Sequence, residues 1–503
     1  MLLKLPFLLH ALFPKSTPPR QQQQQQLCDN VLLKHCQTME DFVREVVRLF
    51  EAPLRPSALL AMSNQLLVQF RKRLQDCSTC MLPSYNYTLP IGNEKGTYLA
   101  LDVGGSTLRV ALVELCGRTS VGEPMCIKRM ESWRIDGSIK ALKGDAFFDW
   151  MAARIEEMLG QSKHVYEGNA PLPIGLAWSF PVEQTSIQSG TLLEMGKGFH
   201  AAHGVLGRDL GELVMEACRR RDLNVRMDAI VNDSSAALLS RAYLDASTRF
   251  ALILGTGCNA AIHIPVTTLG PGKFGIRPSS WHEKATHVLV NTELSMFGKG
   301  IFPRTRWDEL LNEKHLLPDF QPFEQLISGR YLGEIVRLIL VEAIQTAGLF
   351  GGEVPEGFLE PYSLDTYTIG VIEADDTPTY TYGIHALLSH YSLTTTPTPT
   401  DLNHIRRIIS LVSHRAAAYL AAAIHALWCL HLSAEHLTPP TAPRVSISCS
   451  GSVVEKYPGF QATTQSWLDA LTEASGASAR AVALEPAVDS TILGAAVAAG
   501  CLP

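Results

Sequence analysis

Two segments of this chain share one layout, in which a short glycine turn separates two apolar runs. The first segment spans residues 98–115 (YLALDVGGSTLRVALVEL), and the second spans residues 250–264 (FALILGTGCNAAIHI). Each predicts two strands joined by a tight turn, because apolar and β-branched residues flank the only positions where the backbone is permissive. The backbone N–H groups of such turns can bind an anion. We therefore expect two β-hairpins with the same function.

Neither turn has the spacing of the common nucleotide-binding loops. Gly104-Gly105 lacks the G-x-G-x-x-G pattern, and no G-x-x-x-x-G-K-[ST] sequence surrounds either turn. Apolar and polar side chains alternate with period two after the first turn, which indicates a strand and not a helix. A glycine-rich hairpin by itself is more often a plain turn. The repetition, with Asp102 before the first turn and Asn232-Asp233 between the two, favours phosphoryl transfer.

The bulk composition excludes several classes of protein. The chain has 503 residues, of which 46% are hydrophobic, so it is long enough for two or three domains with a sizeable core. Its net charge of −6 gives no basic field that would attract nucleic acid. Among the eleven cysteines, only Cys77-Ser-Thr-Cys80 has the spacing of metal ligands, and no second Cys or His pair accompanies it. A structural role is the better interpretation of that pair, and scattered thiols fit a reducing compartment.

The N-terminal part differs from the rest of the chain. Residues 1–35 contain six consecutive glutamines and predict a disordered tail. The apolar run 1–13 is short and lacks an obvious cleavage site, and we expect no segment to reach the length of a membrane span. The cytoplasm is the expected location, because an ATP-dependent function needs a supply of ATP, although the apolar run leaves association with an organelle open.

Predicted helices and strands alternate along the remaining chain, which favours an α/β architecture with a cleft between domains. Helical periodicity begins near residue 39, and further helices are predicted over 56–76, 145–159, 323–347 (interrupted at Ser328-Gly329), 402–432 and 491–500. Strands are predicted over 174–180 and 445–449, and a surface loop over 394–400.

Eight ordered motifs resemble one family. They are Leu101–Val110, Ser179–Gly190, Gly196–Phe199, Val231–Asp233, Gly255–Ala260, Val290–Glu293, Phe323–Glu334 and Gly451–Val453. From about residue 38 to the C-terminus the chain resembles the eukaryotic hexokinases, which have the two-domain actin-like ATPase (ribonuclease H-like) fold with a cleft for sugar and ATP. The resemblance implies that residues 36–84 begin the large domain, 85–230 form the small domain and 231–486 the large domain. It also implies that residues 487–503 form a helix returning to the small domain.

The resemblance assigns catalytic and sugar-binding roles. Asp233 corresponds to the general base, which takes the proton of the attacking sugar hydroxyl. Lys197 corresponds to a lysine beside that hydroxyl and the transferring phosphate, where its charge would stabilise the transition state. The residues expected to bind the sugar are Ser179, Phe180, Lys197, Asn232, Asp233, Asn259, Glu293 and Glu324.

The resemblance also assigns a nucleotide site. The residues expected to bind ATP are Asp102, Gly104, Gly105, Ser106, Thr107, Arg109, Gly255, Thr256, Gly257, Gly451, Ser452 and Val453. Asp102 is the expected Mg²⁺ residue, through water, because Mg²⁺ favours carboxylates and retains several of its waters. The expected small-molecule partners are therefore a hexose and ATP, and the oligomeric state stays open.

The chain departs from the common family pattern at three places. Met195-Gly196 precedes Lys197 where typical hexokinases have Trp-Thr, and losing that threonine hydroxyl would weaken glucose binding by roughly 1 kcal/mol or more. The other departures are Ser450 in place of Asp, and Ile492 in place of Gly. These changes resemble the atypical branch that includes the N-acetylglucosamine kinases.

We therefore expect an ATP:hexose 6-phosphotransferase that prefers N-acetylglucosamine, with glucose as the second candidate. A sugar sensor with weak or no catalysis is the alternative. A bacterial-type sugar kinase with a structural zinc is disfavoured, because no Cys-rich cluster of ligands occurs.

Overall fold

The computed structural model describes residues 37–160, 170–193, 195, 199–200, 203–393 and 395–501. Its strands form a five-stranded sheet, a six-stranded sheet and a short hairpin of β6 (Val182–Gln184) and β7 (Gly190–Leu192). The five-stranded sheet has the order β4 (Met125–Arg134), β3 (Thr107–Leu115), β2 (Gly96–Val103), β5 (Leu172–Trp178) and β8 (Val225–Val231). The six-stranded sheet has the order β1 (Leu82–Pro83), β11 (His287–Asn291), β10 (Cys258–Pro265), β9 (Thr248–Leu254), β12 (Val445–Ser450) and β13 (Val482–Pro486).

The two large sheets repeat one topology. In each sheet an antiparallel meander of three strands, β2-β3-β4 or β9-β10-β11, is followed by two parallel strands, β5 and β8 or β12 and β13. Both predicted glycine hairpins are confirmed, and each forms the start of its meander. The repeated sequence layout therefore corresponds to a repeated supersecondary unit.

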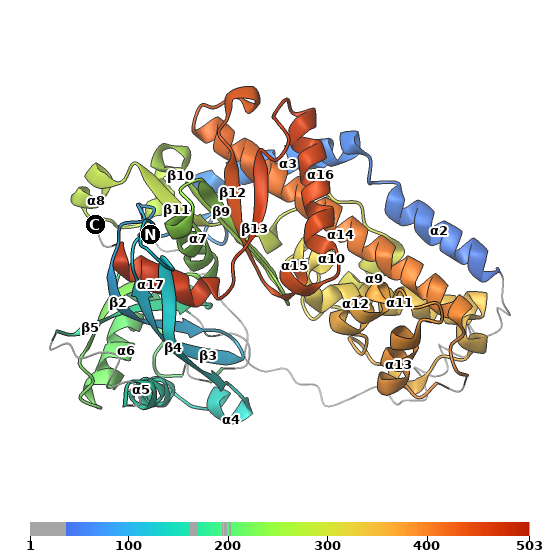
Figure 1. Ribbon diagram of the computed structural model, residues 1–503, viewed down its shortest axis with the longest axis horizontal. Helices are drawn as coiled ribbons and strands as arrows, with labels where there is room; N and C mark the ends of the chain where they lie inside the picture. Colours follow the sequence, from blue (N-terminus) through green and yellow to red (C-terminus); the bar gives the residue numbers. More distant parts are fainter. Residues whose placement is uncertain are drawn as a thin grey trace, which may run out of the picture.

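Two helices of small residues lie between the sheets (Figure 1). They are α7 (Asp233–Leu244) and α17 (Ser490–Gly500), and they share one buried apolar cluster with side chains of both sheets. At Gly494 of α17, an added Cβ would lie 1.8 Å from the carbonyl oxygen of Ala236 in α7. At Gly175 of β5, it would lie 1.8 Å from the carbonyl oxygen of Ala495. Glycine is required at both positions because backbone meets backbone there.

Helices cover the remaining faces. The five-stranded sheet carries α4 (Gly137–Lys140), α5 (Asp145–Gly160) and α6 (Leu210–Arg219), and α8 (Ser279–Lys284) precedes β11. The long α14 (Pro399–Ala434) packs against α2 (Met39–Glu51), α3 (Pro56–Asp76) and α16 (Phe460–Ala474). A mainly helical region, at the lower right of Figure 1, contains α9 (Arg306–Lys314), α10 (Glu324–Ile327), α11 (Gly329–Ala347), α12 (Thr366–Ala374) and α13 (Thr381–His390). The short α15 (Ser452–Lys456) follows β12.

The expectation that no segment reaches the length of a membrane span was wrong for α14. Among the described residues, this helix is the one that is long and apolar enough to cross a membrane, but 89% of its most apolar window is buried inside the fold. Its apolar residues are alanine-rich and face neighbouring helices on several sides, as expected for a helix in the core of a large domain.

Most predicted elements occur near their predicted bounds. The helices over 39–50 and 56–76 correspond to α2 and α3, and the 323–347 pattern divides into α10 and α11 at Ser328. The predicted loop over 394–400 is too long, because α14 already begins at Pro399. The Thr398 hydroxyl accepts from the Asp401 N–H, and the Asp401 carboxylate accepts from the Thr398 N–H, which completes a capping box. Thr394 lies outside the described residues.

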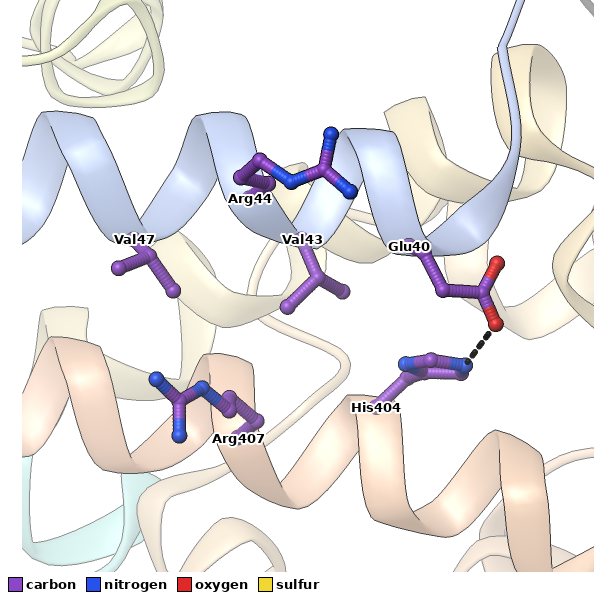
Figure 2. A pocket seen from close by; sticks show the side chains of 6 residues that line it. All are labelled: Glu40, Val43, Arg44, Val47, His404 and Arg407. Carbon is purple, nitrogen blue, oxygen red and sulfur yellow. Dashed lines mark ion pairs between the residues drawn. The ribbon is translucent and has the colours of Figure 1, made fainter.

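A cavity of about 300 Å³ lies between α2 and α14 (Figure 2). It is lined by Glu40, Val43, Arg44, Val47, His404 and Arg407, and Glu40 pairs with His404 at 3.8 Å. None of these residues belongs to the predicted site. This cavity is therefore separate from the predicted functional site.

Candidate functional site

The N-terminus of α7 carries the predicted base. The Asn232 Oδ1 atom caps this helix by accepting from the Ser234 N–H at 3.0 Å and from the Ser234 hydroxyl at 2.6 Å. Asp233 Oδ1 also accepts from the Ser234 N–H, at 2.7 Å, and Asp233 Oδ2 accepts from the Ser179 hydroxyl at 3.2 Å. The predicted base is therefore held by donors from α7 and from the residue that follows β5.

A hydrogen-bonded chain links this helix to the six-stranded sheet. Asn259 Nδ2 lies 3.5 Å from the Ser234 hydroxyl and donates to Asn291 Oδ1 at 2.9 Å. Asn291 Nδ2 in turn donates to Glu293 Oε1 at 2.8 Å. Glu293 has a left-handed backbone, with a φ of 52°. The structure thus holds the Glu293 carboxylate in a defined position after the end of β11.

Glu324 lies against the second glycine turn. Its Oε2 atom accepts from the Cys258 N–H at 2.9 Å. A Cβ at Gly257 would lie 2.7 Å from the same oxygen, so only glycine lets the carboxylate approach the turn this closely. The predicted sugar-binding Glu324 and the predicted phosphate-binding turn are therefore direct neighbours.

The N-terminus of α11 and the segment Gly451–Val453 pack on the same turn. The Gly329 N–H donates to the Gly255 carbonyl at 2.8 Å, and the Arg330 N–H donates to the Thr256 carbonyl at 3.2 Å. The Ser328 hydroxyl donates to the Thr256 carbonyl at 2.9 Å. Gly451 has a φ of 117°, and a Cβ there would lie 2.5 Å from the Leu254 carbonyl. The structure therefore brings together two of the three predicted ATP-binding segments, 255–257 and 451–453.

The third predicted ATP-binding segment is the first glycine turn, Gly104–Thr107. The Gly104 N–H donates to the Thr107 carbonyl at 3.0 Å, which closes the turn, and the Ser179 N–H donates to the Val103 carbonyl at 3.2 Å. Because Ser179 also contacts Asp233, this turn is connected to the start of α7.

The Asp102 carboxylate is paired with Arg109. Arg109 donates to Asp102 Oδ2 from Nε at 2.9 Å and from Nη2 at 2.5 Å, and the Thr491 hydroxyl donates to the same oxygen at 3.2 Å. Arg109 Nη1 also donates to Asp489 Oδ1 at 3.0 Å. These bonds to Asp102 all end on Oδ2, so Oδ1 can accept from a metal-bound water. An Mg²⁺ ion that keeps several of its waters needs only one or two carboxylates, and Asp102 and Asp489 would supply them in competition with Arg109.

The loop with the main departure from the family pattern begins and ends in the core. Met195 and Phe199 are both buried in the apolar cluster of the five-stranded sheet. The Phe199 ring meets the Phe180 ring edge-on at 5.0 Å, and Phe180 also packs against Trp178 at 5.2 Å. Lys197 lies outside the described residues, so its catalytic role stays a prediction.

Five residues join the site that were not among its predicted members: Ser234, Asn291, Arg330, Asp489 and Thr491. Ser234 directly follows a predicted site residue, Asn291 and Arg330 lie in the motifs Val290–Glu293 and Phe323–Glu334, and Asp489 and Thr491 shortly precede Ile492, one of the departures from the family pattern. The signal for Arg330 was the interruption of the helical pattern at Ser328-Gly329. Among the described residues, no group of three or more His, Cys, Asp or Glu side chains is arranged to hold a metal ion directly.

Comparisons with known proteins agree with this geometry. Two family models, both described as hexokinase, match residues 43–243 and 249–501. "Hexokinase-5" of Oryza sativa subsp. japonica is 31% identical over 427 residues, which cover 82% of this chain and 81% of the relative. "N-acetylglucosamine kinase 1" of Candida albicans is 29% identical over 480 residues, which cover 90% and 92%.

A solved structure of a hexokinase from Schistosoma mansoni, complexed with glucose, superposes with a TM-score of 0.75. It is 27% identical, and the match covers 93% of this chain and all of the solved chain. The repeated sheets, the joined glycine turns and these matches lead to one conclusion: this chain belongs to the hexokinase family, the hexose kinases that use ATP, and has the two-domain actin-like ATPase fold.

Proposed function

We propose that this protein transfers the γ-phosphoryl group of ATP to the 6-hydroxyl of a hexose, with Asp233 as the general base. The supporting observation is one continuous path of contacts between the two glycine turns. It runs from Val103 through Ser179 to Asp233, then through Ser234 and Asn259 to the strand β10, where Cys258 contacts Glu324. In this path the proposed base lies between the two turns that we propose to bind phosphate.

In this proposal Asp233 accepts the proton of the 6-hydroxyl as its oxygen attacks the γ-phosphorus. A general base must lie within hydrogen-bond reach of the proton that it takes. The Ser234 N–H and the Ser179 hydroxyl fix the two carboxylate oxygens, so the group is oriented before the sugar arrives. A fixed orientation reduces the entropy that the transition state must lose.

The carboxylates of Glu293 and Glu324 are the proposed acceptors for other sugar hydroxyls. Carboxylate oxygens accept hydrogen bonds in defined directions, which discriminates between hydroxyl arrangements. The side-chain amide of Asn259 donates to Asn291, and that of Asn291 donates to Glu293, so both amides hold the Glu293 carboxylate in place. Their proposed contribution is to position this carboxylate.

On the nucleotide side, the two glycine turns are the proposed phosphate ligands through their backbone N–H groups. Asp102 and Asp489 are the residues that would hold Mg²⁺, which when bound neutralises the charge developing on the phosphates. Lys197 is the proposed cation beside the transferring group. Arg330 supports the second turn through its backbone N–H, which is bonded to the Thr256 carbonyl, while its guanidinium lies over the rings of Tyr331 and Tyr362.

N-acetylglucosamine is the proposed preferred sugar, with glucose as the second candidate. Two observations favour it: the threonine that typical hexokinases have before the lysine is Gly196 here, and one relative that aligns over most of the chain is an N-acetylglucosamine kinase. A smaller residue leaves room for a substituent at the sugar 2-position and removes a hydroxyl contact to glucose.

A substrate panel tests the proposal. ADP release with ATP and Mg²⁺ is measured for glucose, fructose, mannose, glucosamine and N-acetylglucosamine. We expect the highest kcat/KM with N-acetylglucosamine, and we expect Gly196→Thr to shift the ratio toward glucose. A clear preference of the natural chain for glucose contradicts the sugar assignment and leaves the kinase assignment intact.

The same panel addresses the alternative of a sugar sensor. Sugar binding by calorimetry without ADP release for any hexose would support the sensor and contradict the kinase. The presence of Asp102, Lys197, Asn232 and Asp233 together favours the kinase, because a sensor needs no general base.

A further inference from the structure

Two thiols lie in contact at the C-terminal end of α3. The Sγ atoms of Cys77 and Cys80 are 3.1 Å apart, and both cysteines are free. The two side chains are buried, whereas Ser78 and Thr79 between them are exposed, so the pair lies just beneath the surface. A disulfide has an S–S distance of about 2.05 Å, so a sulfur movement of about 1 Å would close the pair.

Hydrogen-bond donors and cations surround the pair. The Thr79 hydroxyl lies 3.5 Å from the Cys77 sulfur, and Arg73 Nη1 donates to that sulfur at 3.9 Å. Lys273 Nζ donates to the carbonyls of both cysteines, at 2.8 Å for Cys80. This lysine fixes the backbone of the turn and brings a positive charge close to the sulfurs.

The two thiols differ in acidity. Burial raises the pKa of Cys77, but hydrogen bonds from Thr79 and Cys80 outweigh it and lower that pKa to about 6. Burial, together with the neighbouring Cys77, raises the pKa of Cys80 to about 12. A thiolate beside a protonated thiol is the arrangement in which one sulfur reacts with an oxidant and the other resolves the product.

The turn is also joined to the candidate sugar site. Met81, which follows Cys80, has a left-handed backbone with a φ of 51°, and its N–H donates to the Thr292 carbonyl at 3.1 Å. The next residue, Leu82, pairs with Asn291 in the sheet. Asn291 and Thr292 directly precede Glu293, and Asn291 holds its carboxylate. A change in the cysteine turn therefore reaches Glu293 through one backbone hydrogen bond.

We propose that Cys77 and Cys80 form a redox-sensitive dithiol, and that its closure to a disulfide weakens sugar binding by displacing Glu293. The effect on sugar binding rests on the proposed function. With hydrogen peroxide as oxidant, the Cys77 thiolate attacks one peroxide oxygen, the O–O bond breaks, and hydroxide leaves and is protonated to water. The Cys80 sulfur then attacks the sulfenic sulfur and loses its proton as the S–O bond breaks, which releases a second water. The two sulfurs lose two electrons, and the peroxide is reduced.

The first experiment maps the disulfide in the full chain. Reduced protein is treated with stoichiometric hydrogen peroxide, alkylated and analysed by peptide mass. We expect a Cys77–Cys80 link that dithiothreitol reverses, and in Cys80→Ser a sulfenic acid at Cys77 that a dimedone probe traps. Cys116→Ser, which changes a cysteine outside the pair, is the matched control and should form the same link. Oxidation at other cysteines without this link overturns the proposal.

The second experiment measures the consequence. A misplacement of about 1 Å can lower a reaction rate by up to 10²-fold. Here the displacement is transmitted through a sheet, so we expect a smaller effect, a rise in the KM for the hexose of about threefold or more. We expect kcat to change less, and the Cys80→Ser variant to show no such rise. A mapped disulfide with an unchanged KM overturns the coupling to Glu293. If the chain phosphorylates no hexose, calorimetric sugar affinity replaces KM, and the mapping result does not depend on catalysis.

Discussion

At Asp233 both carboxylate oxygens are occupied by donors of the protein before any substrate binds. The donors come from α7 itself, through Ser234, and from the end of β5, through Ser179. A residue that only capped the helix would need no contact with β5, and the capping role is already filled by Asn232. Helix capping therefore does not require the Asp233 carboxylate, and its contact with Ser179 needs another explanation.

We predict that Asp233→Ala lowers kcat by about 10²–10⁴-fold, the usual contribution of a general base. The sugar dissociation constant should change little, because Glu293 and Glu324 remain. Steady-state kinetics and calorimetry measure the two quantities, and Asp376→Ala, at an exposed position, is the control. A kcat close to that of the natural chain would remove Asp233 from the role of base.

A second prediction at this scale concerns Asn291, which links Asn259 to Glu293. Asn291→Asp replaces the donor to Glu293 by a second negative charge, and losing a hydrogen bond to a charged group costs about 1.5–3 kcal/mol. We expect the KM of the hexose to rise by about 10-fold or more and the KM of ATP to stay nearly constant. An equal rise in both constants would contradict a role confined to the sugar side.

At the scale of elements, the crossing of α17 over α7 connects the two sheets. It depends on Gly494, whose Cα lies against the backbone of Ala236. In an exposed helix interior Gly→Ala stabilises by roughly 1 kcal/mol. Here an added methyl group would force two helices apart, so the Gly→Ala substitution should destabilise the protein instead of stabilising it.

We therefore predict that Gly494→Ala lowers the free energy of unfolding by about 1–3 kcal/mol, the usual cost of overpacking a core. Gly160→Ala, at the end of α5 with no neighbour within 4 Å of the added carbon, is the matched control and should be neutral or stabilising. Urea unfolding measures both. Because α7 carries Asp233, kcat should fall in the first variant alone. Equal stabilities of the two variants would show that α17 and α7 do not pack as described.

At the scale of the whole molecule, the hydrophobic core holds several neutral histidines. Burial lowers the pKa of His263 to about 3, with His287 adding to the effect, and burial lowers the pKa of His425 to about 4. His425 uses both ring nitrogens, which lie 2.8 Å from the Ser63 hydroxyl and 2.9 Å from the Ser475 hydroxyl. These side chains connect α14 to α3 and to the end of α16.

These shifts predict a loss of stability in acid. In the unfolded chain a histidine takes up a proton near pH 6.5, whereas the folded chain resists protonation until pH 3 to 4. The stabilising contribution is therefore complete above about pH 6.5 and is lost as the pH falls through this interval. We expect the free energy of unfolding to decrease between pH 6.5 and 4, and His263→Gln to reduce that slope. His385→Gln, at an exposed position, should leave the slope unchanged; an equal slope in all three proteins would contradict the prediction.

Much of the fold follows from local pattern. The two hairpins, α2, α3 and the break at Ser328 were predictable because periodicity and glycine act over a few residues. The end of the loop before α14 was misplaced, because the Thr398–Asp401 capping box lies inside a stretch rich in Thr and Pro. The apolar pattern of α14 is shared by core helices and membrane spans, and only the packing of this helix inside the fold separates the two.

The repeated hairpins, the order of the motifs and hence the family follow from the amino-acid sequence, because these features depend on residue types at short spacing. Only the folded structure brings distant residues into contact: Asn291 with Asn259, Asp489 and Thr491 with Arg109, and the Cys77–Cys80 turn with Thr292. Residues such as Arg109 and Asp489 lie 380 positions apart, and no local preference specifies their contact. The contact arises because α17, which consists mainly of small residues, packs closely between two sheets that share one topology.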